Sequence, residues 1–123
     1  MAKYFSDKEM ACSHCGEVHM DPVFMEYLDE VREQYGKPLI VTSGYRCSEH
    51  PIEVKKAKAG AHTTGKAVDF AVDRGDAYTL LEIAVGTGWF TGIGIQQKGS
   101  GRFIHLDICE EPEMSPRPTI WSY

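Results

Sequence analysis

The sequence lacks a long apolar run. No stretch of its 123 residues approaches the ~20 consecutive apolar residues that a membrane-spanning helix needs. The N-terminal segment has no apolar run after Lys3, so it does not have the pattern of an ordinary secretory signal. We therefore expect a protein that is synthesised in the cytoplasm without a signal peptide and that does not insert into a membrane.

An excess of positive charge is also missing. The chain has 13 Lys and Arg residues against 18 Asp and Glu residues, which gives a formal net charge of −5. A nucleic-acid-binding surface needs clustered cations to neutralise phosphates. The composition therefore argues against nucleic acid as the partner.

Cysteine is scarce, with four residues in the chain. Four are too few for a disulfide-built scaffold of this length, and in a reducing compartment they are free thiols or metal ligands. Cys12-x2-Cys15 and Cys47-x2-His50 have the spacing of a four-ligand structural zinc site. Reduced packing thiols, or one bridge between Cys12 and Cys15, are the alternatives. We interpret Cys109 as a small buried hydrophobe.

The length suits one compact domain, and 42% hydrophobic residues with 11% aromatic residues suffice for a core. We expect a single domain over residues 1–123. It would include an irregular N-terminal segment (1–19) and an extended C-terminal tail (110–123), which Trp121 and Tyr123 would pin to the surface.

Local patterns indicate two helices and several strands. Asp21 is an N-cap before Pro22, and Gly36 stops the first helix. Short apolar or alternating runs indicate strands. The expected elements are helices over 22–35 and 73–85 and strands over 38–42, 66–72, 89–95 and 103–109. The pattern predicts an α+β domain with a small, mostly antiparallel sheet and helices packed to one side.

The second helix is expected to bury one stripe of apolar side chains. The residues assigned to that stripe are Tyr78, Leu81, Ile83 and Ala84. The loop over 47–65 has room for one short helix after Pro51.

Three polar side chains stand out because they lie on or beside apolar strands. Asp69 falls on the strand face opposite Val68 and Phe70, and His62 precedes it across a loop that contains Gly65. His105 lies on a buried strand, where a polar group needs a partner. Two imidazoles and one carboxylate with an open fourth position form the ligand set of a catalytic zinc site. The alternatives are a solvent-facing Asp69 and a hydrogen-bonded core histidine.

Arg46 comes just after the predicted strand over 38–42. A guanidinium beside an acidic metal site can hold a substrate carboxylate or stabilise a developing oxyanion. A surface salt bridge is the alternative interpretation.

Four motifs follow one another along the chain: Ser43-Gly-Tyr-Arg46, His62-x-x-Gly-x-Ala-x-Asp69, Phe103-Ile-His-Leu-Asp107 and Trp121-Ser-Tyr123. In this order they resemble the zinc D-Ala-D-Ala carboxypeptidase and peptidoglycan endopeptidase family, and in particular its short, phage-associated members. The opening Phe5-Ser-x-x-Glu9 and Cys12-x-x-Cys-Gly16 also look like those members.

The resemblance implies a small antiparallel sheet with a hedgehog-like zinc fold, and one zinc ion held by His62, Asp69 and His105. It also implies that Arg46 faces the substrate, with Ser43 and Tyr45 as further substrate contacts.

The sequence departs from the family pattern at the general base. Many members carry an acid three residues before the last zinc histidine, and Arg102 occupies that position here. We predict that Asp107 replaces this acid as the catalytic base, with Glu110 and Glu111 as weaker candidates. The alternative is that Asp107 orients a zinc histidine.

The expected function is hydrolysis of peptide bonds in bacterial peptidoglycan by a zinc-activated water, as a carboxypeptidase or an endopeptidase. The alternative is a catalytically weak or inactive zinc-stabilised module that binds cell wall or belongs to a phage particle, because a hedgehog-like relative keeps such a site chiefly for binding. We expect a monomer that acts on the wall after release, or from within a phage particle. A redox or metal-sensing protein built on Cys12 and Cys15 is a third, more remote hypothesis.

Overall fold

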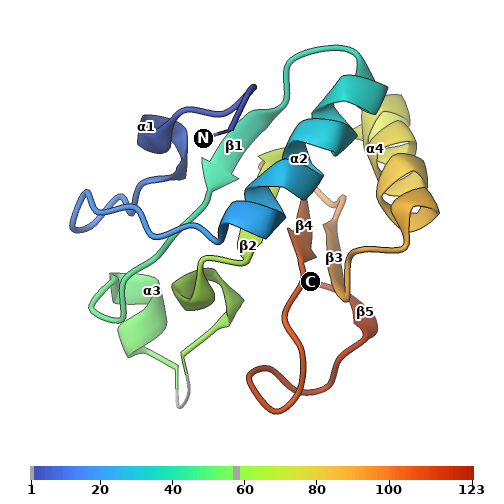
Figure 1. Cartoon of the computed structure of the whole chain (residues 1–123). Coiled ribbons are helices and arrows are strands. Elements are labelled where there is room, and N and C mark those ends of the chain that lie inside the picture. Colours follow the sequence, from blue (N-terminus) through green and yellow to red (C-terminus); the bar gives the residue numbers. More distant parts are fainter. Residues whose placement is uncertain (1, 57–58) are drawn as a thin grey trace.

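The computed structural model describes residues 2–56 and 59–123. Among these residues, four α-helices, one 3-10 helix and five strands follow one another along the chain (Figure 1). In chain order they are α1 (Asp7–Met10), α2 (Pro22–Tyr35), β1 (Ile40–Ser43), α3 (Pro51–Val54), η1 (Ala61–Thr64), β2 (Ala67–Ala71), α4 (Arg74–Thr87), β3 (Gly92–Gln96), β4 (Phe103–Asp107) and β5 (Thr119–Ser122).

Helix α2 begins and ends where its capping residues predict. The Asp21 carboxylate accepts a hydrogen bond from the backbone N–H of Phe24 at 2.9 Å, and Pro22 occupies the first turn. Gly36 adopts a φ of 80°, a left-handed conformation that glycine reaches without strain. The sequence-based prediction of this helix is confirmed.

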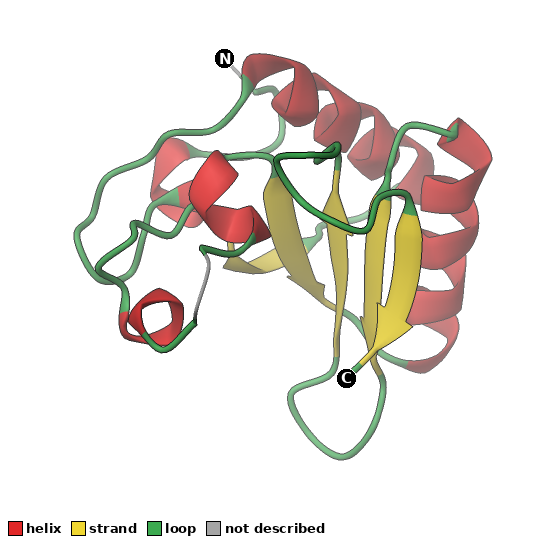
Figure 2. Ribbon diagram, turned by 90° about the horizontal axis from the view of Figure 1, so that it is seen from below, coloured by secondary structure: helices red, strands yellow, loops and turns green. Residues whose placement is uncertain are grey.

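The strands form one five-stranded sheet in the order β1-β2-β4-β3-β5. The first three pairs are antiparallel, and β3 pairs with β5 in parallel. Helices α2 and α4 lie side by side over one face of the sheet (Figure 2). The prediction of an α+β fold with a mostly antiparallel sheet is confirmed.

The main core fills the space between these two helices and the sheet. It includes Phe24, Leu28 and Val31 of α2, Leu80 and Ala84 of α4, and Val68, Phe70, Ile93, Ile104 and Leu106 of the strands. Because side chains alternate along a strand, Asp69, His105 and Asp107 point to the other face of the sheet. The fold thus separates an apolar face from a polar one.

The C-terminal tail differs from the prediction. Residues Thr119–Ser122 are not merely laid over the surface but form β5, with Trp121 opposite Gly94 of β3. This short strand was not predicted because the tail contains three prolines, and proline lacks the backbone N–H donor that a sheet needs.

Two smaller predictions need correction. The N-terminal segment is not wholly irregular, because Ser6 and Glu9 form a capping box that begins α1. Tyr78 does not face the core: it is 70% exposed, and the buried stripe of α4 consists of Ala77, Leu80 and Ala84.

Within the described residues, no helix combines the length and the apolar character needed to cross a membrane.

Candidate metal centre

Strand register brings two of the three predicted metal ligands together. Asp69 of β2 lies directly opposite His105 of β4, and their Oδ1 and Nδ1 atoms are 2.9 Å apart. His62 of η1 completes the group, with its Nε2 atom 3.3 Å from the same Asp69 oxygen. One ligand atom from each residue lies within 4.8 Å of the others, and all three residues are buried. We call these three residues the triad.

Gly65 makes the return of the chain from His62 to β2 possible. Its φ is 76°, and a Cβ atom there would lie 1.9 Å from the carbonyl oxygen of His19. The carbonyl of Gly65 accepts a hydrogen bond from the backbone N–H of Asp21 at 2.9 Å. Only glycine allows this close passage, which sets His62 over the sheet.

The outer nitrogen of each histidine has its own partner. His62 Nδ1 donates to the carbonyl oxygen of Gly44 at 2.8 Å, and His105 Nε2 donates to Asp107 Oδ2 at 2.7 Å. Protein ligands of a metal are oriented in this way, since the hydrogen bond at one ring nitrogen fixes the lone pair on the other.

The other two ring nitrogens, His62 Nε2 and His105 Nδ1, face Asp69, and in the neutral histidines they would repel its carboxylate unless a cation lies between them. In the neutral tautomers just described, two nitrogen lone pairs face the same Asp69 carboxylate oxygen, with no proton between them. An ion such as Zn²⁺ would accept all three lone pairs, and the donor set of two imidazoles and a carboxylate fits it. Without a metal, extra protons must supply the positive charge.

The electrostatics point the same way. Burial raises the pKa of Asp69, but the close contacts with His105 and His62 outweigh burial and hold that pKa well below its usual range. Burial lowers the pKa of His105, yet Asp107 and Asp69 raise it more. The centre therefore favours a positive charge beside Asp69.

Asp107 is fully buried and has a partner for each oxygen. Its Oδ2 atom accepts from His105 and from Arg117 Nη2 at 2.8 Å, and its Oδ1 atom accepts from Arg117 Nε at 3.0 Å. Cys109 N–H donates to Oδ1 at 3.2 Å. These contacts favour the alternative role, in which Asp107 orients His105; its role as the base stays a prediction.

Gly92 makes room for this carboxylate. It lies opposite Asp107 in the sheet, and a Cβ atom there would lie 2.3 Å from both carboxylate oxygens. A side chain at this position would displace Asp107 from His105.

Sequence reasoning missed Arg117. Besides binding Asp107, its guanidinium lies 5.1 Å from the ring centre of Trp121, whose ring is in turn 5.1 Å from that of His105. A lone arginine in a proline-rich tail gives no signal of this role. The fifth strand carries Trp121 to the centre and holds the tail in place.

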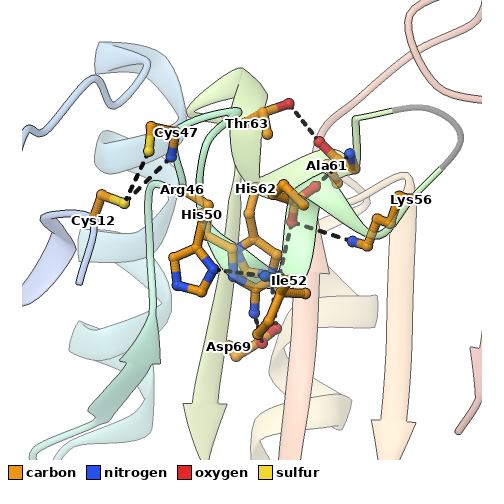
Figure 3. Close-up of polar contacts among 12 residues, drawn as sticks. Cys12, Arg46, Cys47, His50, Ile52, Lys56, Ala61, His62, Thr63 and Asp69 are labelled. Atoms are coloured by element: carbon orange, nitrogen blue, oxygen red, sulfur yellow. Dashed lines mark hydrogen bonds and ion pairs between the residues drawn. The ribbon is translucent and has the colours of Figure 1, made fainter. Parts of the chain in front are cut away.

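Arg46 faces the triad (Figure 3). Its Nη2 atom lies 3.9 Å from Asp69 Oδ2, and its Nη1 atom is 3.2 Å from Glu53 Oε2. The Arg46 side chain is only 14% exposed, so the surface salt bridge considered above does not describe it.

Glu53, also missed from the sequence, is the buried partner of Arg46. Its carboxylate additionally accepts from Lys56 Nζ at 3.2 Å and from Gly60 N–H at 2.8 Å. Burial alone would raise the pKa of Glu53, but the hydrogen bonds from Gly60, Arg46 and Lys56 have a larger, opposite effect. The pKa of Glu53 is therefore below its usual value. Its oxygens are thus engaged in holding Arg46 and the loop in place.

The other candidates lie at varying distances from the triad. Ser43 pairs with Asp69 in the β1–β2 register. Tyr45 stacks edge-on against His19, with ring centres 5.0 Å apart. Their roles as substrate contacts stay predictions. Arg102 donates to the carbonyl of Gly99 at 2.8 Å in the turn between β3 and β4.

Glu110 and Glu111, the weaker base candidates, are exposed. Glu111 accepts from Ser115 Oγ at 3.1 Å and from the backbone N–H of Arg117 at 3.3 Å. These contacts tie it to the tail.

A second group of potential metal ligands lies apart from the triad. Cys12, Cys15 and Cys47 bring their sulfur atoms within 4.8 Å of one another. His50, the predicted fourth ligand, does not belong to that group; its Nε2 atom lies 3.0 Å from Ser13 Oγ.

A family model described as Peptidase M15 matches residues 3–107. The matched segment includes the triad, Arg46, the three clustered cysteines and Asp107, and it ends before β5. No curated protein matches the chain.

Proposed function

The chain belongs to the peptidase M15 family, and we propose that it is a zinc-dependent peptidase that hydrolyses peptide bonds of bacterial peptidoglycan. The observation that carries the zinc proposal is that two histidine nitrogens, His105 Nδ1 and His62 Nε2, lie 2.9 Å and 3.3 Å from the same Asp69 oxygen. A zinc ion bound by three protein side chains supplies a water of lowered pKa and a Lewis acid for the scissile carbonyl.

The chain's own residues divide the remaining work. His62, Asp69 and His105 would hold the ion. Asp107 keeps the His105 ring oriented, with Nδ1 facing inward. Arg46, held by Glu53, is positioned to offset negative charge on the substrate as the peptide carbonyl is attacked.

The peptidoglycan substrate follows from the motif resemblance and from Arg46, whose guanidinium suits a peptide carboxylate. Terminal D-Ala removal and cleavage within a stem or crosslink use the same centre. We propose that the protein acts as a monomer, on the wall after release or from within a phage particle.

One observation favours a second function, a zinc-stabilised module that binds cell wall. Both oxygens of Asp107 are engaged by His105 and Arg117, and the position of the usual family acid is Arg102. Such a protein would bind zinc and wall fragments without turnover.

Incubation of purified peptidoglycan with the protein and zinc separates the two functions. We expect newly released amines, and mass spectrometry of the soluble fragments identifies the bond. His105→Ala should abolish release. Stoichiometric zinc and wall binding with no released amine, even at high protein concentration, would reject the peptidase and leave the binding module.

A further inference from the structure

The segment over residues 12–17 forms a tight turn that gathers cysteines. Cys12 N–H donates to the Glu17 carbonyl and Gly16 N–H donates to the Cys12 carbonyl, each at 2.8 Å. Gly16 adopts a φ of 78°, which closes the turn directly after Cys15. The turn holds the sulfur atoms of Cys12 and Cys15 close enough to bind the same metal ion.

Cys47 reaches the same point from a distant part of the chain. Its sulfur lies 3.7 Å from that of Cys12, and its backbone N–H donates to Cys12 Sγ at 3.3 Å (Figure 3). All three cysteines are free thiols. The separation of the two sulfurs exceeds the ~2.05 Å of a disulfide bond, and it suits sulfurs that surround one ion.

We propose that Cys12, Cys15 and Cys47 bind a structural zinc ion, separate from the triad. Three thiolates are soft ligands that select zinc over hard cations. The N–H group aimed at Cys12 Sγ acts as outer hydrogen bonds do in metal–thiolate sites, by stabilising the sulfur's negative charge. The inference rests on these contacts and not on the proposed peptidase activity.

The predicted fourth ligand, His50, is not assigned. Its Nδ1 atom accepts a hydrogen bond from the backbone N–H of Ile52 at 3.1 Å, so the ring proton of the neutral form sits on Nε2. Nε2 then donates to Ser13 Oγ. Neither nitrogen offers a free lone pair to the sulfur cluster. The site is therefore assigned three thiolate ligands, and a water molecule would complete the tetrahedral coordination that zinc prefers.

This ion would brace the backbone that carries Arg46. Tyr45 N–H donates to the Met10 carbonyl at 2.9 Å, and Arg46 N–H donates to the His62 carbonyl at 3.1 Å. Cys47 directly follows, so an ion on its sulfur would fasten the loop to the N-terminal turn. The loop would then be fixed on both sides of Arg46.

Metal content and cobalt spectroscopy test the proposal on the full chain, purified under reducing conditions. We expect two zinc ions per wild-type chain, and one in Cys47→Ser. Replacement of zinc by Co²⁺ should give an intense near-ultraviolet thiolate-to-metal absorption. That absorption should vanish in Cys47→Ser, persist in His105→Ala, and persist in the control Cys109→Ala, which removes a thiol outside the cluster.

A measurement on the wild type guards against a variant that fails to fold. With zinc bound, Cys12, Cys15 and Cys47 should resist alkylation, and a chelator should expose them. Absence of the thiolate absorption in folded wild type, or a Cys12–Cys47 disulfide that forms in place of metal binding, would overturn the proposal. Loss of peptidase activity with retained thiolate absorption would instead count only against the proposed function.

Discussion

The triad and the cysteine cluster are built from different kinds of structure. Asp69 and His105 face each other because β2 and β4 pair in a fixed antiparallel register. Cys12, Cys15 and Cys47 meet because a tight turn and a loop touch. Sites on sheet strands are held more precisely than sites on loops. This difference agrees with the roles proposed for the two groups, a catalytic metal site at the triad and a structural metal site at the cysteine cluster.

The two groups also differ in the charges around them. Charged side chains surround the triad, namely Asp107, Arg117, Arg46 and Glu53. At the cysteine cluster, backbone N–H groups stabilise negative charge on sulfur. Burial raises the pKa of the Cys12 thiol, but the N–H groups of Cys47, Cys15 and His14 outweigh burial and lower this pKa to about 7. Substitutions in the two groups should therefore have separable effects.

The largest expected effect is loss of activity on substitution of a sheet-borne ligand. Asp69→Asn removes the negative charge that two histidines face, so we expect peptidase activity to fall to background. Cys15→Ser should keep measurable activity, because the cluster does not touch the triad. Assays of peptidoglycan hydrolysis on both variants check this, and equal losses would break the distinction between the two groups.

Arg46 connects the two groups, and its removal should have the next largest effect. Arg46→Ala should lower kcat/KM by about 10²- to 10³-fold, the usual effect of losing one group that stabilises transition-state charge. Zinc content should stay at the wild-type value. Arg46→Lys, which keeps the charge, should recover part of the loss; full activity in Arg46→Ala would contradict the role proposed for the guanidinium.

Asp107→Asn should weaken zinc binding at the triad by roughly 10- to 100-fold, as loss of an orienting partner typically does. Activity should then recover when zinc is added in excess. A general base would behave differently, with a kcat loss of about 10²- to 10⁴-fold that zinc does not restore. Zinc titrations monitored by activity distinguish the two roles.

The smallest effect tests the packing beneath the triad. A Cβ atom on Gly94 would lie 2.7 Å from the Trp121 ring, so Gly94→Ala should destabilise the fold by about 1–3 kcal/mol. Gly86→Ala is the matched control, because Gly86 lies in α4 with open space around it. That control should be neutral or stabilise by about 0.5–1 kcal/mol. Thermal denaturation compares them; equal melting temperatures would show that β5 does not pack tightly on the sheet.

Patterns that act over a few residues were enough to predict much of the fold. Asp21, Pro22 and Gly36 mark the bounds of α2, and strand alternation places Asp69 and His105 on one face. His62 and Asp69 alone were weak evidence for a metal site. His105 on its apolar strand, Arg46 and the ordered motifs that resemble the zinc peptidase family together made the three residues candidate ligands.

Contacts between distant segments were not visible. Glu53 and Arg117 are ordinary charged residues in loop-like sequence, and their roles arise only when a helix turn and a tail strand fold back onto the sheet. Strand β5 was not predicted for the same reason. Its four residues follow several prolines, and so short a segment shows too little alternation of apolar and polar side chains to indicate a strand. The prediction that Tyr78 belongs to the buried stripe of α4 was wrong. Apolar residues occur on more than one side of this helix, so the sequence alone does not identify the side that faces the core.

The contact between Arg117 and Asp107 couples the centre to the folding of the whole domain. Arg117 reaches Asp107 from the tail that β5 joins to the sheet. Small domains usually fold in one cooperative transition, with no significantly populated intermediates. The orientation of His105 by Asp107 and the pairing of β5 with β3 should therefore be gained and lost together.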